Sequence, residues 1–219
     1  MSEQIDRGQA GRSARREYER RKGRREAHLR SRYGAIGGVA ARMTSEPQHT
    51  TSWLQGHAGE VKAAAKLERL LRHTGVILLH DRGIPHSPAN IDHIAIGPGG
   101  ITVIDTKAIA GRTRVERRGG FLSKRSQHLI VGGRDKSKLI EGVERQVDVM
   151  RAVFGDYDIR AALCWLKADG LPLIGTLEMR GIRVAAPRPV AKIAARPGGL
   201  CAADVNNLAS RVAKHFPPA

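Results

Sequence analysis

Aromatic residues are scarce in this chain, where they make up 4% of 219 residues. The core must therefore be largely aliphatic, and the 41% hydrophobic content is enough for one good core at this length. The two cysteines, Cys164 and Cys201, form neither a disulfide framework nor a zinc motif with the scattered histidines. No apolar run is long enough to span a membrane and the N-terminus has no signal-peptide core, so we expect a cytoplasmic protein without a transmembrane segment.

Negative charge is also in short supply. The chain has 38 Lys and Arg against 21 Asp and Glu, a net charge of +17 and a pI near 11.0. Such an imbalance indicates a polyanionic partner, with nucleic acid as the first candidate and an anionic membrane surface as the second.

Residues 1–45 differ in composition from the rest. They carry a strong excess of basic residues, too few apolar positions for a helical stripe, and Gly23 within the basic run. We expect a basic, mobile or transiently helical N-terminal arm that ends in a glycine-rich linker, followed by a single domain at 46–219. The arm could contact phosphates or could be only a solvated tail.

A β-hairpin is predicted at residues 90–107, NIDHIAIGPGGITVIDTK. Two β-rich runs, 91–96 and 101–107, flank Gly-Pro-Gly-Gly, whose proline and following glycine suit a type II turn. If these four residues close an antiparallel pair, Asp92 lies opposite Asp105 and Asn90 lies opposite Lys107. Because side chains alternate along a strand, these four residues share one face.

Two carboxylates directly across a ladder would repel unless a positive group lies between them. A hard divalent cation such as Mg²⁺ takes oxygen ligands and typically uses one or two carboxylates together with water and phosphate oxygens. Lys107 adds a compact positive charge for a phosphate or an attacking water. The alternative is a hairpin with two solvated aspartates and a solvated lysine.

A helix is predicted from Thr51 or Ser52 to Gly75. Its apolar stripe consists of Ala64, Leu67 and Leu71, and Glu60 stands on the same stripe. A carboxylate at such a position costs stability unless it is paired or metal-bound, although it could also lie at the rim of the core. If this helix packs on the sheet, it can bring Glu60 to the two aspartates.

The remainder favours a mixed sheet covered by helices. We expect at least one further strand in residues 111–133, a helix from Asp135 or Ser137 to Phe154, strands at 159–166 and 181–186, a proline-rich loop, and a closing amphipathic helix at 203–216. Gln146 interrupts the apolar stripe of the second helix. Six basic residues between the hairpin and that helix could contact phosphates or remain solvated: Arg112, Arg114, Arg117, Arg118, Lys124 and Arg125.

Three motifs, GHAGE ending in Glu60, NIDH containing Asp92, and VIDTK containing Asp105 and Lys107, together resemble the nuclease-related domain (NERD). This family is a branch of the PD-(D/E)xK nuclease superfamily, which includes many restriction enzymes and Holliday-junction resolvases. The resemblance extends from about Trp53 through the second predicted helix.

The resemblance implies a restriction-endonuclease-like α-β-β-β-α-β core and hydrolysis of phosphodiester bonds in nucleic acid, DNA in the first place, with Mg²⁺ or Mn²⁺. Glu60, Asp92 and Asp105 would be the catalytic and metal-binding acids and Lys107 the catalytic lysine, with Asn90 and Gln146 as accessory residues. Ile91 stands where many superfamily members have proline, and Asp105 is shorter than the usual glutamate. The alternative is an inactive nucleic-acid-binding protein that retains the nuclease fold.

Overall fold

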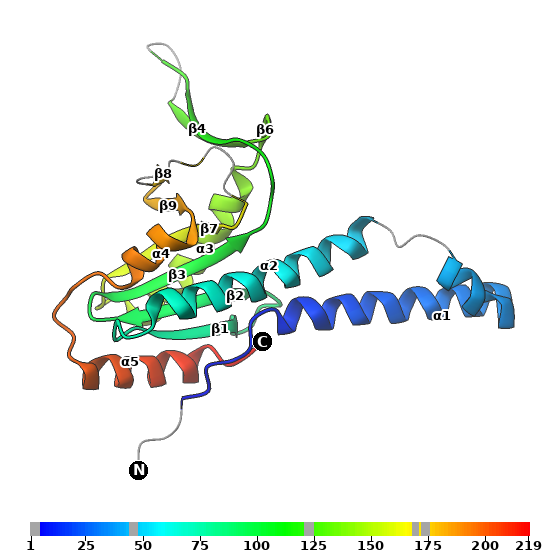
Figure 1. Ribbon diagram of the computed structural model, residues 1–219, viewed down its shortest axis with the longest axis horizontal. Helices are drawn as coiled ribbons and strands as arrows, with labels where there is room; N and C mark the ends of the chain where they lie inside the picture. The colour runs from blue at the N-terminus through cyan, green and yellow to red at the C-terminus, as the bar shows by residue number, and fades with distance from the viewer. Residues whose placement is uncertain (1–4, 44–47, 121–124, 168–170, 172–175) are drawn as a thin grey trace.

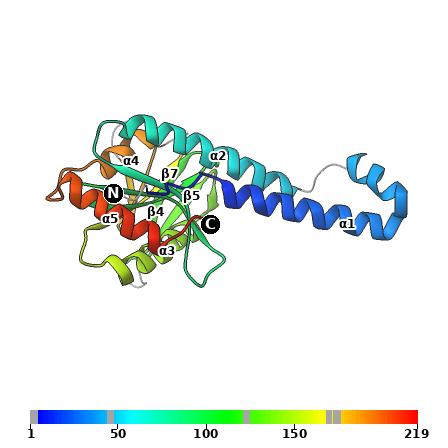
Figure 2. The same ribbon diagram turned by 90° about the horizontal axis from the view of Figure 1, so that it is seen from below.

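The computed structural model describes residues 5–43, 48–120, 125–167, 171 and 176–219. A six-stranded sheet lies between two layers of helices (Figures 1 and 2). Across the sheet, the order of strands is β1 (Ile77–Gly83), β2 (Asn90–Gly97), β3 (Gly100–Lys107), β7 (Ile159–Trp165), β9 (Ile182–Ala185) and β8 (Leu177–Met179). The contacts of β3 with β7 and of β7 with β9 are parallel, and the others are antiparallel. The predicted mixed α/β fold is therefore confirmed.

Each face of the sheet is covered by its own pair of helices. Helix α2 (Gln48–Leu71) and α4 (Pro187–Ala194) pack on one face, where Leu67, Leu71 and Val190 meet Ile104 and Ala162. Helix α3 (Lys138–Phe154) and α5 (Ala202–His215) cover the other face and contribute to the larger core. Both cores are almost entirely aliphatic, as the low aromatic content predicts.

The central elements follow the expected order, α2, β1, β2, β3, α3 and β7. A second, three-stranded sheet is inserted between β3 and α3 and consists of β4 (Thr113–Arg118), β5 (Ser126–Val131) and β6 (Arg134–Asp135). It extends away from the main sheet (Figure 1).

Among the described helices, none is long and apolar enough to cross a membrane.

Most of the N-terminal segment forms a helix. Helix α1 (Arg12–Met43) continues through Gly23 and through the glycine-rich stretch predicted as a linker, and it projects from the body of the molecule beside α2 (Figures 1 and 2). Before α1, the carbonyl of Arg7 accepts a hydrogen bond of 2.7 Å from the amide of His80 in β1. The buried guanidinium of Arg82 donates to the carbonyls of Asp6, Ala213 and Phe216, which joins the N-terminal segment to the end of α5.

Two local predictions are wrong. The expected proline-rich loop contains α4, with Pro187 at its first position and Pro189 also in its first turn, where backbone N–H groups have no partner within the helix and proline costs little. The hairpin turn is not type II, because the positive φ of 106° falls on Gly100 and not on Gly99. A Cβ on Gly100 would lie 2.3 Å from the carbonyl oxygen of Asp158, just before β7, so there is no room for a side chain at position 100.

Candidate active site

The predicted hairpin register is confirmed from Gly97–Gly100 to His93–Ile104. At the next residues the ladder between β2 and β3 opens, and the Asp92 carboxylate accepts a hydrogen bond of 2.8 Å from the backbone amide of Thr106. Asp92 and Asp105 are both 7% exposed. Two acids therefore lie close together in a nearly dry environment at the end of the hairpin.

The arrangement of the two acids raises the pKa of Asp92. Burial, followed by the nearby charge of Asp105, raises the pKa of Asp92 to about 7, whereas Lys107 and the Thr106 amide act in the opposite direction. Nζ of Lys107 lies 2.6 Å from Oδ2 of Asp105. Burial alone would lower the pKa of Lys107, but Asp105 and Asp92 outweigh it, so the pKa is raised and the lysine stays protonated.

Helix α2 brings Glu60 to the same centre. Ala64, Leu67 and Leu71 are buried against the sheet, so the predicted stripe fixes the orientation of the helix. Burial and then the charge of Asp92 raise the pKa of Glu60 to about 9. Its Oε2 atom is buried and has no hydrogen-bond partner among the described residues.

Asn90 and Gln146 connect the elements around the acids by hydrogen bonds. The side-chain amide of Gln146, from α3, donates to the carbonyl of Asn90 at 3.3 Å. The side chain of Asn90 is directed toward β1 and α1, where its Nδ2 donates to Asp81 at 2.7 Å and to Ser13 at 3.1 Å. Among the described residues, Asn90 therefore forms no hydrogen bond with Lys107, and its side chain joins β2 to β1 and α1.

Asp81 is the acid that the sequence reasoning missed. It lies in β1, is 1% exposed, and adopts a left-handed φ of 48°. Its carboxylate accepts hydrogen bonds from the backbone and hydroxyl of Ser13 at 2.6 and 2.7 Å, at the start of α1. Its charge also contributes to the raised pKa values of Glu60 and Asp92. The signal in the sequence was a polar His-Asp-Arg run directly after the apolar residues Ile77, Leu78 and Leu79 that begin this strand.

The histidines next to these acids form a separate structural pair. His93 lies opposite Ile104 and is fully buried. Its Nδ1 lies 3.0 Å from Nδ1 of His80, whose Nε2 lies 3.0 Å from Glu68 of α2. Burial, and then His80, lowers the pKa of His93 to about 3, so this ring stays neutral within the fold.

The donor set fits a hard divalent cation, although no cage is preformed. No group of three or more His, Cys, Asp or Glu side chains in the described part of the chain is placed to hold a metal ion. Mg²⁺, however, commonly takes only one or two carboxylates and completes its shell with water and phosphate oxygens. Glu60 Oε2 is buried and has no hydrogen-bond partner among the described residues, and the pKa values of Glu60 and Asp92 are raised, as expected for carboxylates that are placed to share a cation.

The basic segment beyond β3 lies on the second sheet. Arg112, Arg114, Arg117, Arg118 and Arg125 are exposed, whereas Lys124 lies outside the described residues. Glu116 forms ion pairs with Arg114 at 2.5 Å and Arg118 at 2.9 Å, so part of this positive charge is neutralised locally.

An α-β-β-β-α-β core with buried acids and an Asp-x-Lys pair at the end of its hairpin defines a nuclease-like protein. The nuclease-related domain model matches residues 55–165, which is half of the chain and contains Glu60, Asp92, Asp105 and Lys107. The chain belongs to the nuclease-related domain family, and this membership points to a nuclease-related function with nucleic acid as the partner. No curated protein and no solved structure matches the chain.

Proposed function

We propose that this protein hydrolyses phosphodiester bonds in nucleic acid, DNA in the first place, with the help of Mg²⁺ or Mn²⁺. The observation that carries the proposal is the convergence of Glu60, Asp92 and Asp105 from three elements on one buried centre that also contains Lys107. A folded protein gains nothing in stability from gathering like charges in this way, and functional sites are where such perturbed groups concentrate.

Asp92 and Asp105 would hold the cation at the open end of the hairpin, and Glu60 would complete the shell directly or through water. When bound, the cation would lower the pKa of a water molecule and polarise the scissile phosphate. The Thr106 amide fixes one oxygen of Asp92, so this carboxylate is already oriented.

Lys107 would stabilise negative charge on the phosphate oxygens as the transition state forms. Because Asp105 and Asp92 keep it protonated, Lys107 has no free lone pair and would not act as the general base. Its contact with Asp105 leaves the ammonium group close to the acids where the phosphate would bind.

The second sheet and α1 offer positive charge outside the catalytic centre. The exposed arginines of β4, together with Arg112 and Arg125, would contact phosphates on either side of the scissile bond, because non-specific affinity for nucleic acid is mainly electrostatic. Lys124, which the sequence groups with these arginines as a candidate phosphate contact, lies outside the described residues.

The test is cleavage of supercoiled plasmid, linear duplex and single-stranded DNA, with RNA in parallel, by purified protein with Mg²⁺, Mn²⁺ or EDTA. We expect cleavage only with a divalent cation, and cleavage at least ~100-fold slower from a parallel preparation of Asp105→Asn. Salt-sensitive binding without cleavage under all of these conditions would reject the enzyme and leave a nucleic-acid-binding protein with the nuclease fold.

A further inference from the structure

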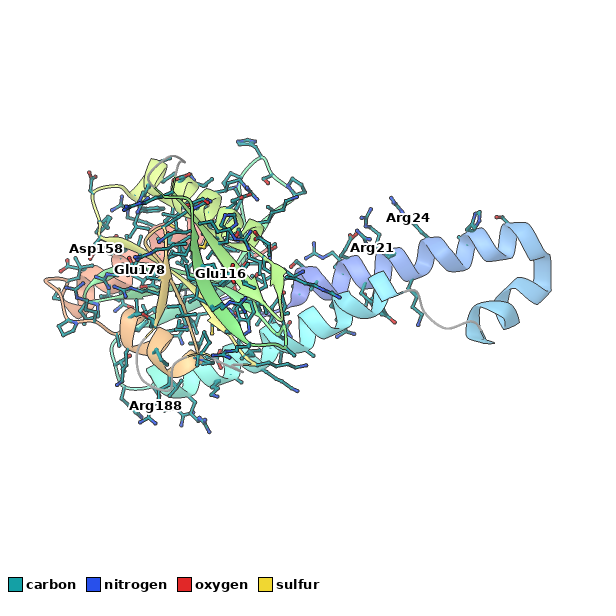
Figure 3. The ribbon with its side chains drawn as sticks, turned by 90° about the horizontal axis from the view of Figure 1, so that it is seen from above. Arg21, Arg24, Glu116, Asp158, Glu178 and Arg188 are labelled. Carbon is teal, nitrogen blue, oxygen red and sulfur yellow. The ribbon has the colours of Figure 1, made fainter. Side chains whose placement is uncertain are left out.

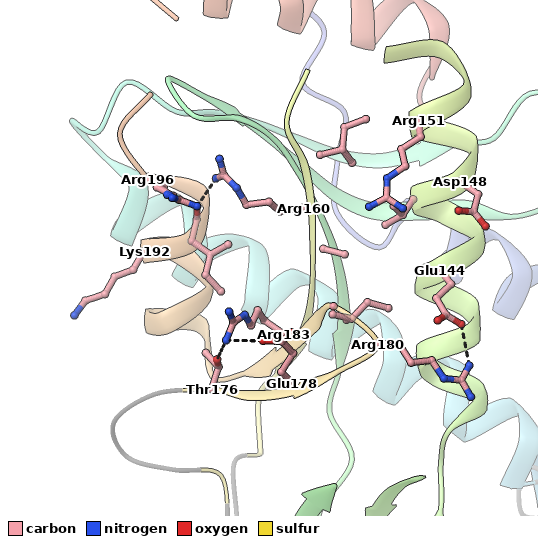
Figure 4. A pocket seen from close by; sticks show the side chains of 16 residues that line it. Glu144, Asp148, Arg151, Arg160, Thr176, Glu178, Arg180, Arg183, Lys192 and Arg196 are labelled. Carbon is pink, nitrogen blue, oxygen red and sulfur yellow. Dashed lines mark hydrogen bonds and ion pairs between the residues drawn. The ribbon is translucent and has the colours of Figure 1, made fainter. Parts of the chain in front are cut away.

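A second concave site lies at the other end of the parallel strands. In the register of β3 with β7, Lys107 lies beside Trp165 at the acidic end, whereas Ile101 lies beside Ile159 at the opposite end. Six residues separate these two levels, which corresponds to about 20 Å along the strands at roughly 3.3 Å per residue. A pocket of about 740 Å³ opens at the Ile159 level, between α3, α4 and the β8–β9 hairpin (Figure 4).

The floor of this pocket is apolar. Val147 of α3, Ile159 and Ala161 of β7, and Ile182 of β9 line it, and each is less than 9% exposed. A volume of several hundred Å³ with an apolar floor and a few polar groups is the usual form of a small-molecule site. The floor is therefore suited to the flat face of a heterocyclic ring.

Three arginines of the pocket walls form ion pairs with nearby carboxylates. Arg180 pairs with Glu144 at 3.0 Å, and Arg183 pairs with Glu178 at 2.9 Å. Arg160 is held by Asp158 at 2.6 Å and also donates to the carbonyl of Gly99. These three carboxylates offset the positive charges of Arg160, Arg180 and Arg183 before any ligand binds.

Three further cations have no side-chain partner in the part of the chain that the structure describes. They are Arg151 on the α3 wall, and Lys192 and Arg196 on the α4 wall. Asp148 is the remaining carboxylate of the lining, so positive charge exceeds negative charge. In Figure 4, Arg151 and Arg196 stand on opposite walls, which favours a ligand with more than one anionic group.

From this combination we propose that the pocket binds a nucleotide carrying at least two phosphate groups. The phosphates contact Arg151, Lys192 and Arg196, and the base lies on the apolar floor. Guanidinium groups suit phosphates because they donate paired hydrogen bonds in a fixed plane. Two sources supply this chemistry: a free nucleoside diphosphate or triphosphate, or consecutive nucleotides of a single strand. The site does not depend on the proposed nuclease activity.

The test is calorimetric titration of the full chain in EDTA, which prevents metal-dependent cleavage, with ADP and with a single-stranded hexanucleotide as separate probes. The variant Arg151→Gln/Arg196→Gln removes one cation from each wall. The matched control is Arg145→Gln/Arg188→Gln, which makes the same change of charge on the same two helices. Arg145 is exposed in α3, Arg188 is exposed at the start of α4 (Figure 3), and both lie outside the pocket lining.

We expect saturable binding of at least one probe, weakened at least tenfold in the pocket variant and less than twofold in the control. Binding of ADP identifies a free nucleotide as a sufficient ligand, and binding of the hexanucleotide alone identifies a strand. The proposal is overturned if neither probe saturates the wild-type protein, or if both double variants weaken binding equally. All four substituted side chains are exposed, so unchanged thermal unfolding should accompany each result.

Discussion

The two ends of strands β3 and β7 carry opposite charges in opposite surroundings. At one end, Asp92 and Asp105 are almost completely buried and Glu60 contributes a buried carboxylate oxygen. At the other end, about 20 Å away along the strands, Arg151, Lys192 and Arg196 are exposed around a pocket.

The difference lies in how strongly each charge depends on its neighbours. A buried carboxylate has lost water, so its protonation and the fold respond to every nearby charge. An exposed cation retains its hydration and is screened by salt, so its removal affects little besides a bound anion. Substitutions at the acidic end should therefore change catalysis and stability together, and those at the basic end should change binding alone.

The largest effect is expected from Asp105→Asn. It removes a charged oxygen ligand and the ion-pair partner of Lys107 while preserving the shape of the side chain. Cleavage should fall by at least ~100-fold, which is the scale of losing one electrostatic contribution to a transition state. The metal-free protein should also unfold at a lower temperature, because a partly buried lysine is left without its partner.

Both quantities are accessible from one preparation, by plasmid cleavage with Mg²⁺ and by thermal unfolding in EDTA. Cleavage near the wild-type rate would remove Asp105 from the site. Loss of cleavage with an unchanged unfolding temperature would contradict the expectation that substitutions at the acidic end change stability as well as catalysis.

Glu60→Gln tests whether α2 supplies the third acid. Cleavage should fall by roughly tenfold or more, because the amide cannot provide a negatively charged ligand. Lys62→Gln is the control, since Lys62 is exposed, lies two residues away and points from another side of the helix. Rates measured at saturating DNA should be close to wild type for Lys62→Gln, and an equal loss in both variants would refute the assigned orientation of α2.

The stability of the metal-free protein should decrease as the pH rises from about 7 to about 9, a range in which the buried His80 and His93 are neutral in the folded protein and mostly neutral in the unfolded chain. The pKa values of Glu60 and Asp92 are raised in the folded state to about 9 and about 7, from 4.5 and 3.8, so the fold retains protons that the unfolded chain releases. The resulting stabilisation is complete at low pH and is lost as the pH approaches the folded values. The raised pKa of Lys107 contributes equally throughout this window, because the lysine is protonated in both states below about 10.

Thermal unfolding in EDTA across this pH range gives the measurement. Glu60→Gln should show a smaller decrease than wild type, because its side chain no longer titrates. Parallel curves for the two proteins would mean that Glu60 is not protonated in the folded state. Affinity for Mg²⁺ should rise over the same range, by up to about tenfold per pH unit for each proton released.

The smallest effect is expected from the exposed cations of α1. Lys22 and Arg24 are exposed and have no side-chain partner among the described residues. Figure 3 shows Arg24 and its neighbour Arg21 on the part of α1 that projects from the body of the molecule. If both contact duplex phosphates, Lys22→Gln/Arg24→Gln should lower the log-log salt slope of DNA binding by up to ~1.8, at about 0.9 per contact.

Binding measured over a salt series decides this point, with Arg145→Gln/Arg188→Gln as the charge-matched comparison. A slope indistinguishable from wild type would leave α1 without a role in phosphate binding. Cleavage at saturating DNA should be unaffected, since both residues are exposed and this part of α1 projects away from the body that holds the acids (Figure 3).

Much of the candidate site could be predicted because its signals are local. The Gly-Pro-Gly-Gly turn fixes which residues of β2 and β3 lie opposite each other, and the stripe Ala64, Leu67 and Leu71 fixes the side of α2 that faces the sheet. These short-range periodicities were enough to bring together Asp92, Asp105 and Glu60. The catalytic and metal-binding roles of these residues, and the division at residue 45, remain predictions.

Other features depended on contacts between distant residues. Helix α4 was read as a loop because two prolines appear unfavourable until they are placed in the first turn. Asp81 was missed because its partners Ser13 and Asn90 come from α1 and β2. The N-terminal arm was inferred from composition alone, which could not show that Arg7 bonds to β1 or that Ser13, near the start of α1, bonds to Asp81.

The sequence by itself determined the order of the core elements, the register of the hairpin and the types of residue that could bind a cation, because each follows from turns and side-chain periodicity over a few residues. Only the tertiary structure decided that Lys107 pairs with Asp105 and stays protonated, that the pKa values of Glu60 and Asp92 are raised, and that α3, α4 and the β8–β9 hairpin enclose a basic pocket. Those properties depend on loss of water and on charges brought together from remote parts of the chain, and neither can be read from local spacing.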